Sequence, residues 1–158
     1  MKSETLVINM IKDLIFILII VSLLSCNNNT VQSVDAKFPD GKPAKVSWIK
    51  QENGKNDTIK RLEYYSNGKK KIEGEVKNGK RSGKWTYWFE NGNIWSEGSF
   101  INGLSDGQFN IFNEDGSKYM QSNYKNGVPD GCWTFFNNNI KKKEVYFKDG
   151  KSIKEVNF

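Results

Sequence analysis

The chain of 158 residues contains no histidine, only 2 cysteines and only 3 prolines. Without histidine, the Ser-His-Asp and Cys-His arrangements of nucleophilic enzymes and histidine-based zinc sites are excluded, because each needs an imidazole as base or ligand. An enzyme of this sequence would have to work with carboxylates or lysines. The length allows one domain or two small ones, and 24 basic against 18 acidic residues give a net charge of +6.

Leucine is scarce beyond the first 25 residues. After Cys26 the only leucines are Leu62 and Leu104, and aromatic residues outnumber Ile, Val, Leu and Met together. A helical core of the usual kind is rich in leucine. The composition therefore argues against an all-α fold.

The N-terminal segment has one long apolar run, residues 14–24, preceded by Lys12. Eleven helical residues rise about 16 Å, which is about half of the ~30 Å hydrocarbon core of a bilayer, so a spanning helix is disfavoured. The run has the length of the apolar region of a secretory signal. Residues 23–26, Leu-Leu-Ser-Cys, resemble the lipobox of bacterial lipoproteins, which implies cleavage before Cys26 and attachment of lipid to its sulfur. An ordinary cleaved signal is the alternative.

We therefore expect residues 1–25 to be a lipoprotein signal peptide, Cys26 to be the lipid attachment site, and residues 26–37 to be a flexible tether. Two acyl chains hold a protein on a bilayer far better than one. The expected location is the bacterial cell envelope, as an exported membrane-anchored lipoprotein on the outer membrane or facing the periplasm. A lipidated Cys26 leaves Cys132 without a partner for an internal disulfide.

Glycines recur at an interval of 24 residues. Eleven of the 14 glycines fall into four columns with this spacing: Gly68, Gly92 and Gly116; Gly79, Gly103 and Gly127; Gly83, Gly107 and Gly131; and Gly74 with Gly98. Aromatic columns keep the same interval, among them Trp85, Phe109 and Trp133. Such a period indicates a repeat array. We expect the repeat domain over residues 38–158, with a degenerate unit at about 38–64, clear repeats at about 65–137 and a capping unit at about 138–158.

Within one unit, the alternation of side chains indicates two short strands joined by a tight turn. Trp85 and Tyr87 fall on one face of a strand and Trp88 on the other. Asn91-Gly92 can supply the turn, because both residue types accept positive φ. Glycines inside strands, such as Gly74, are explained if a neighbouring aromatic ring lies over the bare backbone. The predicted fold class is all-β, an elongated antiparallel sheet of tandem 24-residue β-hairpins.

One recurring frame resembles a known family. It reads Tyr65-x-Asn67-Gly68, then Glu-Gly-Glu-Val-Lys-Asn-Gly-Lys over residues 73–80, then Gly83-x-Trp85-x-Tyr87-Trp88-Phe89. This frame resembles the bacterial MORN-repeat variant, over about residues 60–150. The resemblance implies a twisted antiparallel sheet built hairpin by hairpin, with roles in protein or membrane-lipid contact. Some members of that family carry an antitoxin label, which implies an antitoxin or immunity-type role as an alternative.

Regularly spaced aromatic rings mark a candidate binding strip, because such rings bind sugars and extended peptides. The strip consists of Trp88, Phe112 and Phe136, with Trp95 and Tyr119 beside them. The alternative is that these rings are the core of a thin sheet.

Charged residues allow several interpretations. Lysine clusters at residues 69–71, 77–81 and 141–143 could bind lipid phosphates, or could keep the sheet soluble and protect its edges. The Asp-Gly pairs fit turns better than calcium loops, whose ligands crowd within about a dozen residues. Glutamates repeat in one column, and paired carboxylates can hydrolyse glycosides, but carboxylates in register more often pair with lysines across strands. These glutamates are Glu73, Glu97 and Glu144.

Cys132 has no histidine to activate it as a nucleophile. We therefore expect no catalytic residue, metal site or cofactor, and no enzyme activity. The predicted function is a lipid-anchored cell-envelope protein whose repeat sheet is a protein-interaction scaffold. Its partners would be the membrane, through acylated Cys26, and a protein, with a glycan as an alternative and no nucleic acid. An antitoxin role and a glycan-binding module using the aromatic strip are the two other candidates.

Overall fold

The computed structural model describes residues 29–158, and its regular structure there is entirely β-strand. The strands are β1 (Thr30–Lys37), β2 (Pro43–Glu52), β3 (Lys55–Tyr64), β4 (Lys70–Lys77), β5 (Lys80–Trp88), β6 (Ile94–Ile101), β7 (Leu104–Ser105), β8 (Gly107–Phe112), β9 (Lys118–Lys125), β10 (Val128–Pro129), β11 (Gly131–Asn137), β12 (Ile140–Lys148) and β13 (Lys151–Asn157). The signal peptide expected over residues 1–25 and the lipid site expected at Cys26 lie outside the described residues.

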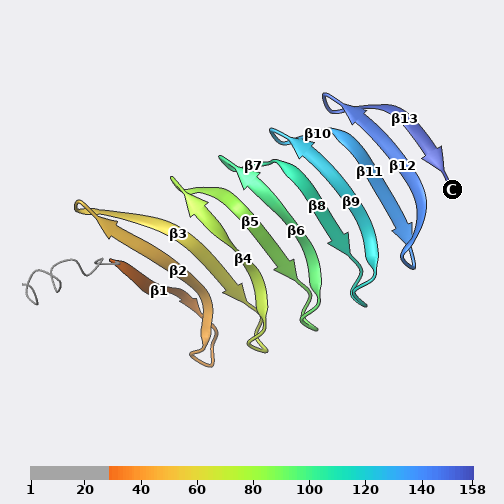
Figure 1. The fold of residues 1–158 in the computed structure, drawn as a ribbon. Coiled ribbons are helices and arrows are strands. Elements are labelled where there is room, and N and C mark those ends of the chain that lie inside the picture. The colour runs from red at the N-terminus through yellow and green to blue at the C-terminus, as the bar shows by residue number, and fades with distance from the viewer. Residues whose placement is uncertain (1–28) are drawn as a thin grey trace, which may run out of the picture.

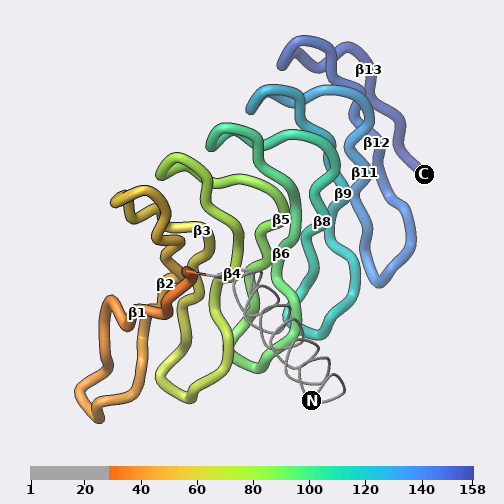
Figure 2. Tube along the Cα trace, turned by 60° about the vertical axis from the view of Figure 1, so that its left-hand side comes forward, coloured from red at the N-terminus to blue at the C-terminus, as the bar shows by residue number. Residues whose placement is uncertain are grey.

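The strands form one open antiparallel sheet (Figure 1). Its order is β1-β2-β3-β4-β5-β6-β8-β9-β11-β12-β13, and the two-residue strands β7 and β10 pair with β6 and β9. Neighbours in the sheet are thus neighbours in the chain. Figure 2 shows the hairpins stacked in series, with β1 near one end and β13 at the other. The predicted all-β class and the antiparallel sheet of tandem hairpins are confirmed.

Strand β1 lies where the sequence predicts part of a flexible tether. It pairs with β2, with Thr30 opposite Lys50 and with a register shift between Val34 and Ala36 that marks a β-bulge. The tether expectation therefore does not hold for residues 30–37. An edge strand takes its order from hydrogen bonds to its neighbour, so the mostly exposed side chains of β1 need no apolar pattern of their own.

Two-residue turns gather along one edge of the sheet, which we call the Asn-Gly edge. They join β2 to β3, β4 to β5, β6 to β7, β9 to β10 and β12 to β13. Their first residues have φ between 50° and 52°: Asn53, Asn78, Asn102, Asn126 and Asp149. Glycine follows in each turn, also with positive φ. Asn-Gly and Asp-Gly are the pairs that tolerate this backbone and match the twist of a hairpin.

The turns along the opposite edge define what we call the loop edge. Four of them have five residues, 38–42, 65–69, 89–93 and 113–117, and the last, 138–139, has two. In the second of them, the Tyr65 N–H donates to the Lys69 carbonyl and the Gly68 N–H donates to the Tyr65 carbonyl, both at 2.9 Å. Asn67 Oδ1 accepts from the Lys69 N–H at 2.9 Å. Such a side chain closes the turn by replacing a backbone acceptor.

The hydrophobic core of the repeats lies on one face, which we call the aromatic face. Val76, Trp85 and Phe100 are at most 8% exposed and pack against Ile72 and Phe109, among others. Rings continue across the sheet with centroids 4.7–6.3 Å apart, in the order Trp85, Phe100, Phe109, Tyr124, Trp133 and Phe147. Large rings that cover one another supply the buried apolar area of a single layer.

Two glycines inside strands lie beneath these rings. A Cβ on Gly74 would overlap the Trp85 indole, and a Cβ on Gly98 would overlap the Phe109 ring. The predicted packing of a ring over bare backbone is thereby confirmed. Ser122 occupies the equivalent position one repeat later and is fully buried. Its hydroxyl has no hydrogen-bond partner among the described residues.

Hydrogen bonds between neighbouring turns tie successive repeats together at both edges. At the Asn-Gly edge, the N–H groups of Gly103, Gly127 and Gly150 donate to the carbonyls of Arg81, Ser105 and Pro129 at 2.8–3.0 Å. At the loop edge, the side-chain amides of Asn67 and Asn91 donate to the carbonyls of Glu90 and Glu114 at 3.1 and 2.8 Å. These bonds fix the spacing of the turns as well as that of the strands.

Candidate interaction surface

The face opposite the aromatic rings, the polar face, carries a row of side chains paired directly across strands. From β4 to β12 this polar row consists of Glu73, Thr86, Glu97, Asn110, Gln121, Thr134 and Glu144. Toward the N-terminus the same row continues into Leu62 and Val46, which are buried. The row therefore changes from apolar to polar between Leu62 and Glu73.

Glu73 is held by two lysines. Its carboxylate accepts from Lys60 Nζ at 2.5 Å and from Lys70 Nζ at 2.6 Å. Partial burial by itself raises the pKa of Glu73, but the hydrogen bonds and positive charges of the two lysines together outweigh it, so the pKa lies below its usual value. Glu73 is therefore a fixed anion at neutral pH.

Glu97 repeats this arrangement one unit later. Lys84 Nζ lies 2.6 Å from its carboxylate, and Asn110 Nδ2 donates to it from the next strand at 3.4 Å. Lys60 and Lys84 are themselves 24 residues apart, each on the strand before its glutamate. The interpretation of the glutamate column as cross-strand partners of lysine agrees with these ion pairs.

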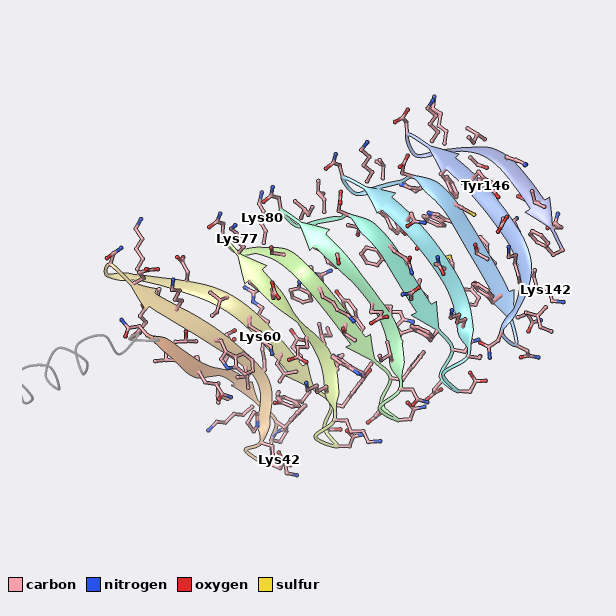
Figure 3. The ribbon with its side chains drawn as sticks, viewed as in Figure 1. Lys42, Lys60, Lys77, Lys80, Lys142 and Tyr146 are labelled. Carbon is pink, nitrogen blue, oxygen red and sulfur yellow. The ribbon has the colours of Figure 1, made fainter. Side chains whose placement is uncertain are left out.

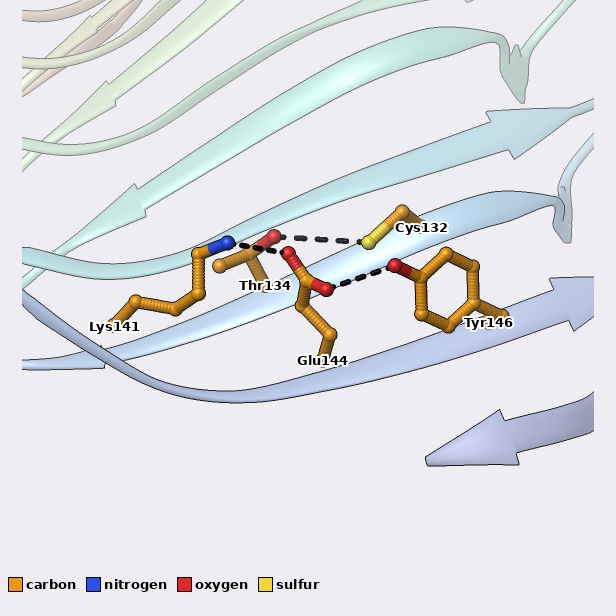
Figure 4. A network of polar contacts seen from close by, with 5 residues as sticks. All are labelled: Cys132, Thr134, Lys141, Glu144 and Tyr146. Carbon is orange, nitrogen blue, oxygen red and sulfur yellow. Dashed lines mark hydrogen bonds and ion pairs between the residues drawn. The ribbon is translucent and has the colours of Figure 1, made fainter. Parts of the chain in front are cut away.

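Glu144 closes the row with a different set of partners (Figure 4). It accepts from Lys141 Nζ at 2.7 Å and from the Tyr146 hydroxyl at 2.8 Å. Lys141 and then Tyr146 hold the pKa of Glu144 below its usual value. The hydrogen bond to Glu144 raises the pKa of Tyr146 to about 12. Within the neighbouring strand β11, Cys132 Sγ lies 3.8 Å from Thr134 Oγ1.

A shallow hollow of about 320 Å³ opens on the polar face beside Trp88. Its lining residues are Lys60, Glu73, Gly74, Glu75, Lys84, Thr86 and Trp88. Lys70 Nζ lies 5.6 Å from the centre of the Trp88 ring, within the range of a cation–π interaction. The hollow thus joins an aromatic surface to alternating charges, a combination that suits polar ligands with one apolar face.

The other strip residues divide into two groups. Phe112 lines a second hollow with Asn93 and Ile94, and Phe136 lies 5.8 Å from Lys118 Nζ. Trp88, Phe112 and Phe136 are all partly buried at equivalent positions. The three rings therefore occupy the same position in successive 24-residue repeats.

Trp95 does not lie beside Trp88. Its ring packs against Tyr87 and Phe89, with centroids 6.0 and 6.2 Å away, and Tyr87 points to the face opposite Trp88 because the two are consecutive in a strand. The cause is a β-bulge: Tyr87 pairs with Ser96 and Trp88 with Ile94, which leaves Trp95 unpaired.

Tyr119 stands at the equivalent bulge of the next repeat, and its side chain is 48% exposed. The candidate strip on the polar face is therefore Trp88, Phe112 and Phe136 without Trp95 and Tyr119.

Sequence reasoning missed the lysines that line the Trp88 hollow. Lys60 and Lys84 were detectable, because they obey the 24-residue interval that organises the glycines. It also missed Arg81 on the aromatic face. The Arg81 guanidinium lies 4.9 Å from the centre of the Trp85 ring and 5.2 Å from that of Phe100, so it covers the core with a charged group.

The described residues contain neither a metal-binding cluster nor a helix that could span a membrane. Among residues 29–158, no three acidic or cysteine side chains come together in a group that could hold a metal ion. The same part of the chain has no helix with the length and apolar character needed to cross a bilayer.

Two stretches of the chain, residues 58–78 and 81–102, match the family model of the MORN repeat variant. The first stretch runs from β3 through β4, and the second runs from β5 through β6. Each therefore includes a returning strand that ends at an Asn-Gly turn. No curated protein matches the chain. The match covers adjacent repeats that contain the Trp88 hollow, so we describe the array as MORN-like.

Proposed function

We propose that this chain is a lipid-anchored protein of the bacterial cell envelope that binds a partner protein along the polar face of its MORN-like sheet. The observation that carries the proposal is the polar row. It crosses seven neighbouring strands, which at about 4.8 Å each span about 29 Å. A surface of this length on an open sheet fits a repeat-based interaction scaffold.

The chemistry of the polar face supports a protein partner. Its carboxylates are fixed by lysines, and half-buried rings such as Trp88 lie next to them. Specific interfaces combine aromatic anchors with a polar surround. The ion pairs hold positive and negative charges at fixed positions on this face. A fixed charge pattern favours a partner with the complementary pattern over other proteins.

A charge exchange tests the polar face. The double variant Lys84→Glu with Glu97→Lys should keep the ion pair and the fold while it exchanges the positions of the two charges on the polar face. Pull-downs from detergent extracts should recover a stoichiometric partner with the wild-type protein and lose it with the variant. The matched control is Lys50→Glu with Glu52→Lys, which exchanges another ion pair away from the row. Equal recovery by all three proteins would refute the polar face as the binding surface.

The lipid anchor has its own test. Cells grown with labelled palmitate should incorporate label into the wild-type protein and not into Cys26→Ala, and the mature N-terminus should be Cys26. Label that persists in Cys26→Ala would refute this attachment site, and an unlabelled wild-type protein would refute the anchor.

An antitoxin or immunity-type role is a more specific form of the same proposal, in which the partner is a toxic protein acting in the envelope. Deletion of the gene should then be harmful only while the partner's gene is intact. Healthy growth of the deletion strain with that partner expressed would exclude this role.

The Trp88 hollow favours a glycan as second candidate, because an aromatic ring beside polar groups binds the apolar face of a sugar. The wild-type protein should then be retained on cell-wall polysaccharide and Trp88→Ala should not. Tyr119→Ala, which removes an exposed ring that does not line the hollow, is the control. Equal retention of Trp88→Ala would exclude the hollow as a sugar site.

A further inference from the structure

The polar face changes its chemistry in the middle of the sheet, where amides replace an ion pair. Lys84 and Glu97 form an ion pair at 2.6 Å in one repeat. In the next repeat the same two positions, 24 residues later, hold Gln108 and Gln121. This part of the face therefore keeps hydrogen-bonding groups but loses their fixed charges.

Other neutral polar side chains surround these two glutamines. Gln108 lies opposite Asn123, and Gln121 lies opposite both Asn110 and Thr134. We call these five residues, which lie on β8, β9 and β11, the amide patch. All five side chains are at least partly exposed, so the patch offers hydrogen-bond donors and acceptors to a ligand.

Two rings and one lysine border the amide patch toward the loop edge. Phe112 lies opposite Lys118, and Lys118 Nζ lies 5.8 Å from the centre of the Phe136 ring. Both rings are partly buried, and Lys118 is exposed. In Figure 3 this row crosses the strands that lie between the labelled Lys60 and Tyr146. A cation is thus held between two aromatic rings.

The charge of Lys118 is not neutralised within the described residues. Lys70 and Lys141 hold corresponding positions in other repeats, and each bonds to a glutamate three residues later. Three residues after Lys118 the chain has Gln121 instead, and Lys118 forms no ion pair in the part of the chain that the structure describes. Its ammonium group is therefore available to an anionic ligand.

The spacing of the two rings fits a sugar chain. Phe112 and Phe136 are two strands apart, which is about 9.6 Å at about 4.8 Å per strand. In a β-1,4-linked chain, successive sugars are turned over, so equivalent groups recur at every second sugar and at nearly this distance. Aromatic rings bind the apolar face of a sugar. One sugar can therefore cover each ring while the sugar between them faces Lys118.

The amide patch favours a sugar chain over a peptide. A polyproline helix has a similar repeat, about 9.3 Å per turn of three residues, but its prolines offer only carbonyl acceptors. The side-chain amides of the patch and the Thr134 hydroxyl both donate and accept, as sugar hydroxyls do. The patch therefore matches sugar hydroxyls better than a proline-rich backbone.

We propose that the polar face over β8, β9 and β11 binds a linear polysaccharide that carries uronate carboxylates. Two sugars lie against Phe112 and Phe136, the carboxylate of the uronate between them accepts from Lys118, and the amide patch bonds to hydroxyls. This inference rests on the glycan candidate for the class of ligand. It adds the charge of the ligand and a second site beside the Trp88 hollow.

Calorimetric titration of the full-length protein in detergent tests the ligand class. The acidic probe is a tetrasaccharide of alternating glucuronate and N-acetylglucosamine, and the neutral probe is a tetrasaccharide of β-1,4-linked N-acetylglucosamine. The acidic probe should bind about tenfold more tightly, because it alone can form a charge-assisted hydrogen bond with Lys118. Equal binding of the two probes, or no binding of the acidic one, would overturn the proposal. Tighter binding of a peptide of Pro-Pro-Glu repeats would also overturn it.

Two variants test the role of Lys118. Lys118→Gln should remove the preference for the acidic probe and leave binding of the neutral probe unchanged. Gln121→Glu should do the same, since its carboxylate can pair with Lys118 as the corresponding glutamates do in other repeats. Lys148→Gln and Gln51→Glu make the same charge changes outside the patch and should retain the preference. A preference that survives either patch variant, or that is lost equally in the controls, would overturn the assignment of Lys118.

Ring variants separate this inference from the proposed function. Phe112→Leu and Phe136→Leu keep an apolar side chain but remove the aromatic face, and each should weaken binding of the acidic probe severalfold. Trp88→Leu should not, because Trp88 lies opposite Ile94 rather than a lysine. Loss of binding in Trp88→Leu alone would place the sugar in the Trp88 hollow, which overturns this inference and leaves the glycan candidate standing. The pull-down of a protein partner involves no sugar, so its result is independent of this titration.

Discussion

Gly74, Gly98 and Ser122 occupy one position in three successive repeats and show how closely the rings approach the backbone. Glycine is required at the first two, since any Cβ there would overlap Trp85 or Phe109. The third carries a Cβ and a hydroxyl that is buried without a partner in the described residues. In this column, therefore, two positions hold a glycine that fits under a ring, and the third holds a serine whose buried hydroxyl has no partner in the described residues.

Replacing Gly98 by Ala should destabilise the protein by about 1–3 kcal/mol, because overpacking forces a ring or a strand to shift. Urea unfolding followed by tryptophan fluorescence measures the change. Ser99→Ala, the exposed neighbour on the other face, is the control and should be close to neutral. An unchanged stability for Gly98→Ala would mean that the Phe109 ring can move aside without cost.

Replacing Ser122 by Ala should have the opposite effect. It removes a hydroxyl that lost its hydrogen bonds to water on folding and gained none in the described structure, and such a group costs about 1–3 kcal/mol. A gain of about 1 kcal/mol in the free energy of unfolding is expected. A loss of stability would show that the hydroxyl has a partner in the folded protein.

The hairpins depend on turns that few residues can form. At Asn102 the backbone has φ of 52°, a left-handed conformation that costs most L-residues roughly 1–2 kcal/mol. Asn102→Ala should therefore lower the free energy of unfolding by about 1 kcal/mol, whereas Asn102→Gly should change it little. Chemical denaturation of the two variants side by side checks this. Equal stability of both would contradict a role for positive φ.

Most features of a hairpin could be predicted from the sequence. The Asn-Gly turns, the alternation of Trp85 with Trp88 and the rings over Gly74 all follow from local rules. Strand β1 could not be predicted, because its order comes from the backbone of β2 and leaves no apolar pattern. The position of Trp95 could not be predicted either, since a bulge reverses the face that alternation assigns.

The candidate site was predictable only in part. The 24-residue interval places Trp88, Phe112 and Phe136 in one column and Glu73 in register with Glu97. It does not show that Lys60 and Lys84 line the hollow, because their reach depends on the twist of neighbouring strands.

The whole sheet should lose stability in acid. The pKa of Glu73 is below its usual value, so Glu73 stabilises the fold above its unfolded-state pKa and this contribution is lost as pH falls through the folded value. Asp40 and Asp115, whose pKa values are also lowered by bonds within their turns, act in the same direction. The melting temperature should fall between about pH 5 and pH 3.

Thermal melts over this range measure the effect. Glu73→Gln should flatten the dependence, while Glu75→Gln, an exposed neighbour without an ion pair in the described residues, should not. A fall of the same size in Glu73→Gln would contradict the role of the Lys60–Glu73–Lys70 cluster.

The array should tolerate loss of one complete unit, because each strand contacts only its neighbours. Deleting residues 92–115 joins Asn91 to Gly116, which preserves the turn and lets β5 pair with β9 in place of β6. A folded protein with a strand-type circular dichroism spectrum and a cooperative melt is expected. Deleting only residues 92–103 removes half a unit, reverses the direction of every later strand, and should give an unfolded or aggregated product. Equal folding of both products would contradict the repeat as the structural unit.

The two terminal strands of the sheet determine whether neighbouring copies of the protein can pair edge to edge. Each terminal strand has a row of backbone groups without a strand partner in the described sheet, and such edges can join end to end. Strand β1 is interrupted by its bulge beside Asp35, and β13 carries Lys151, Lys154 and Glu155 among its seven residues. Bulges and charges discourage edge pairing. Copies held on one membrane by the proposed lipid anchor would therefore collide at these ends yet remain separate, rather than joining into continuous sheets.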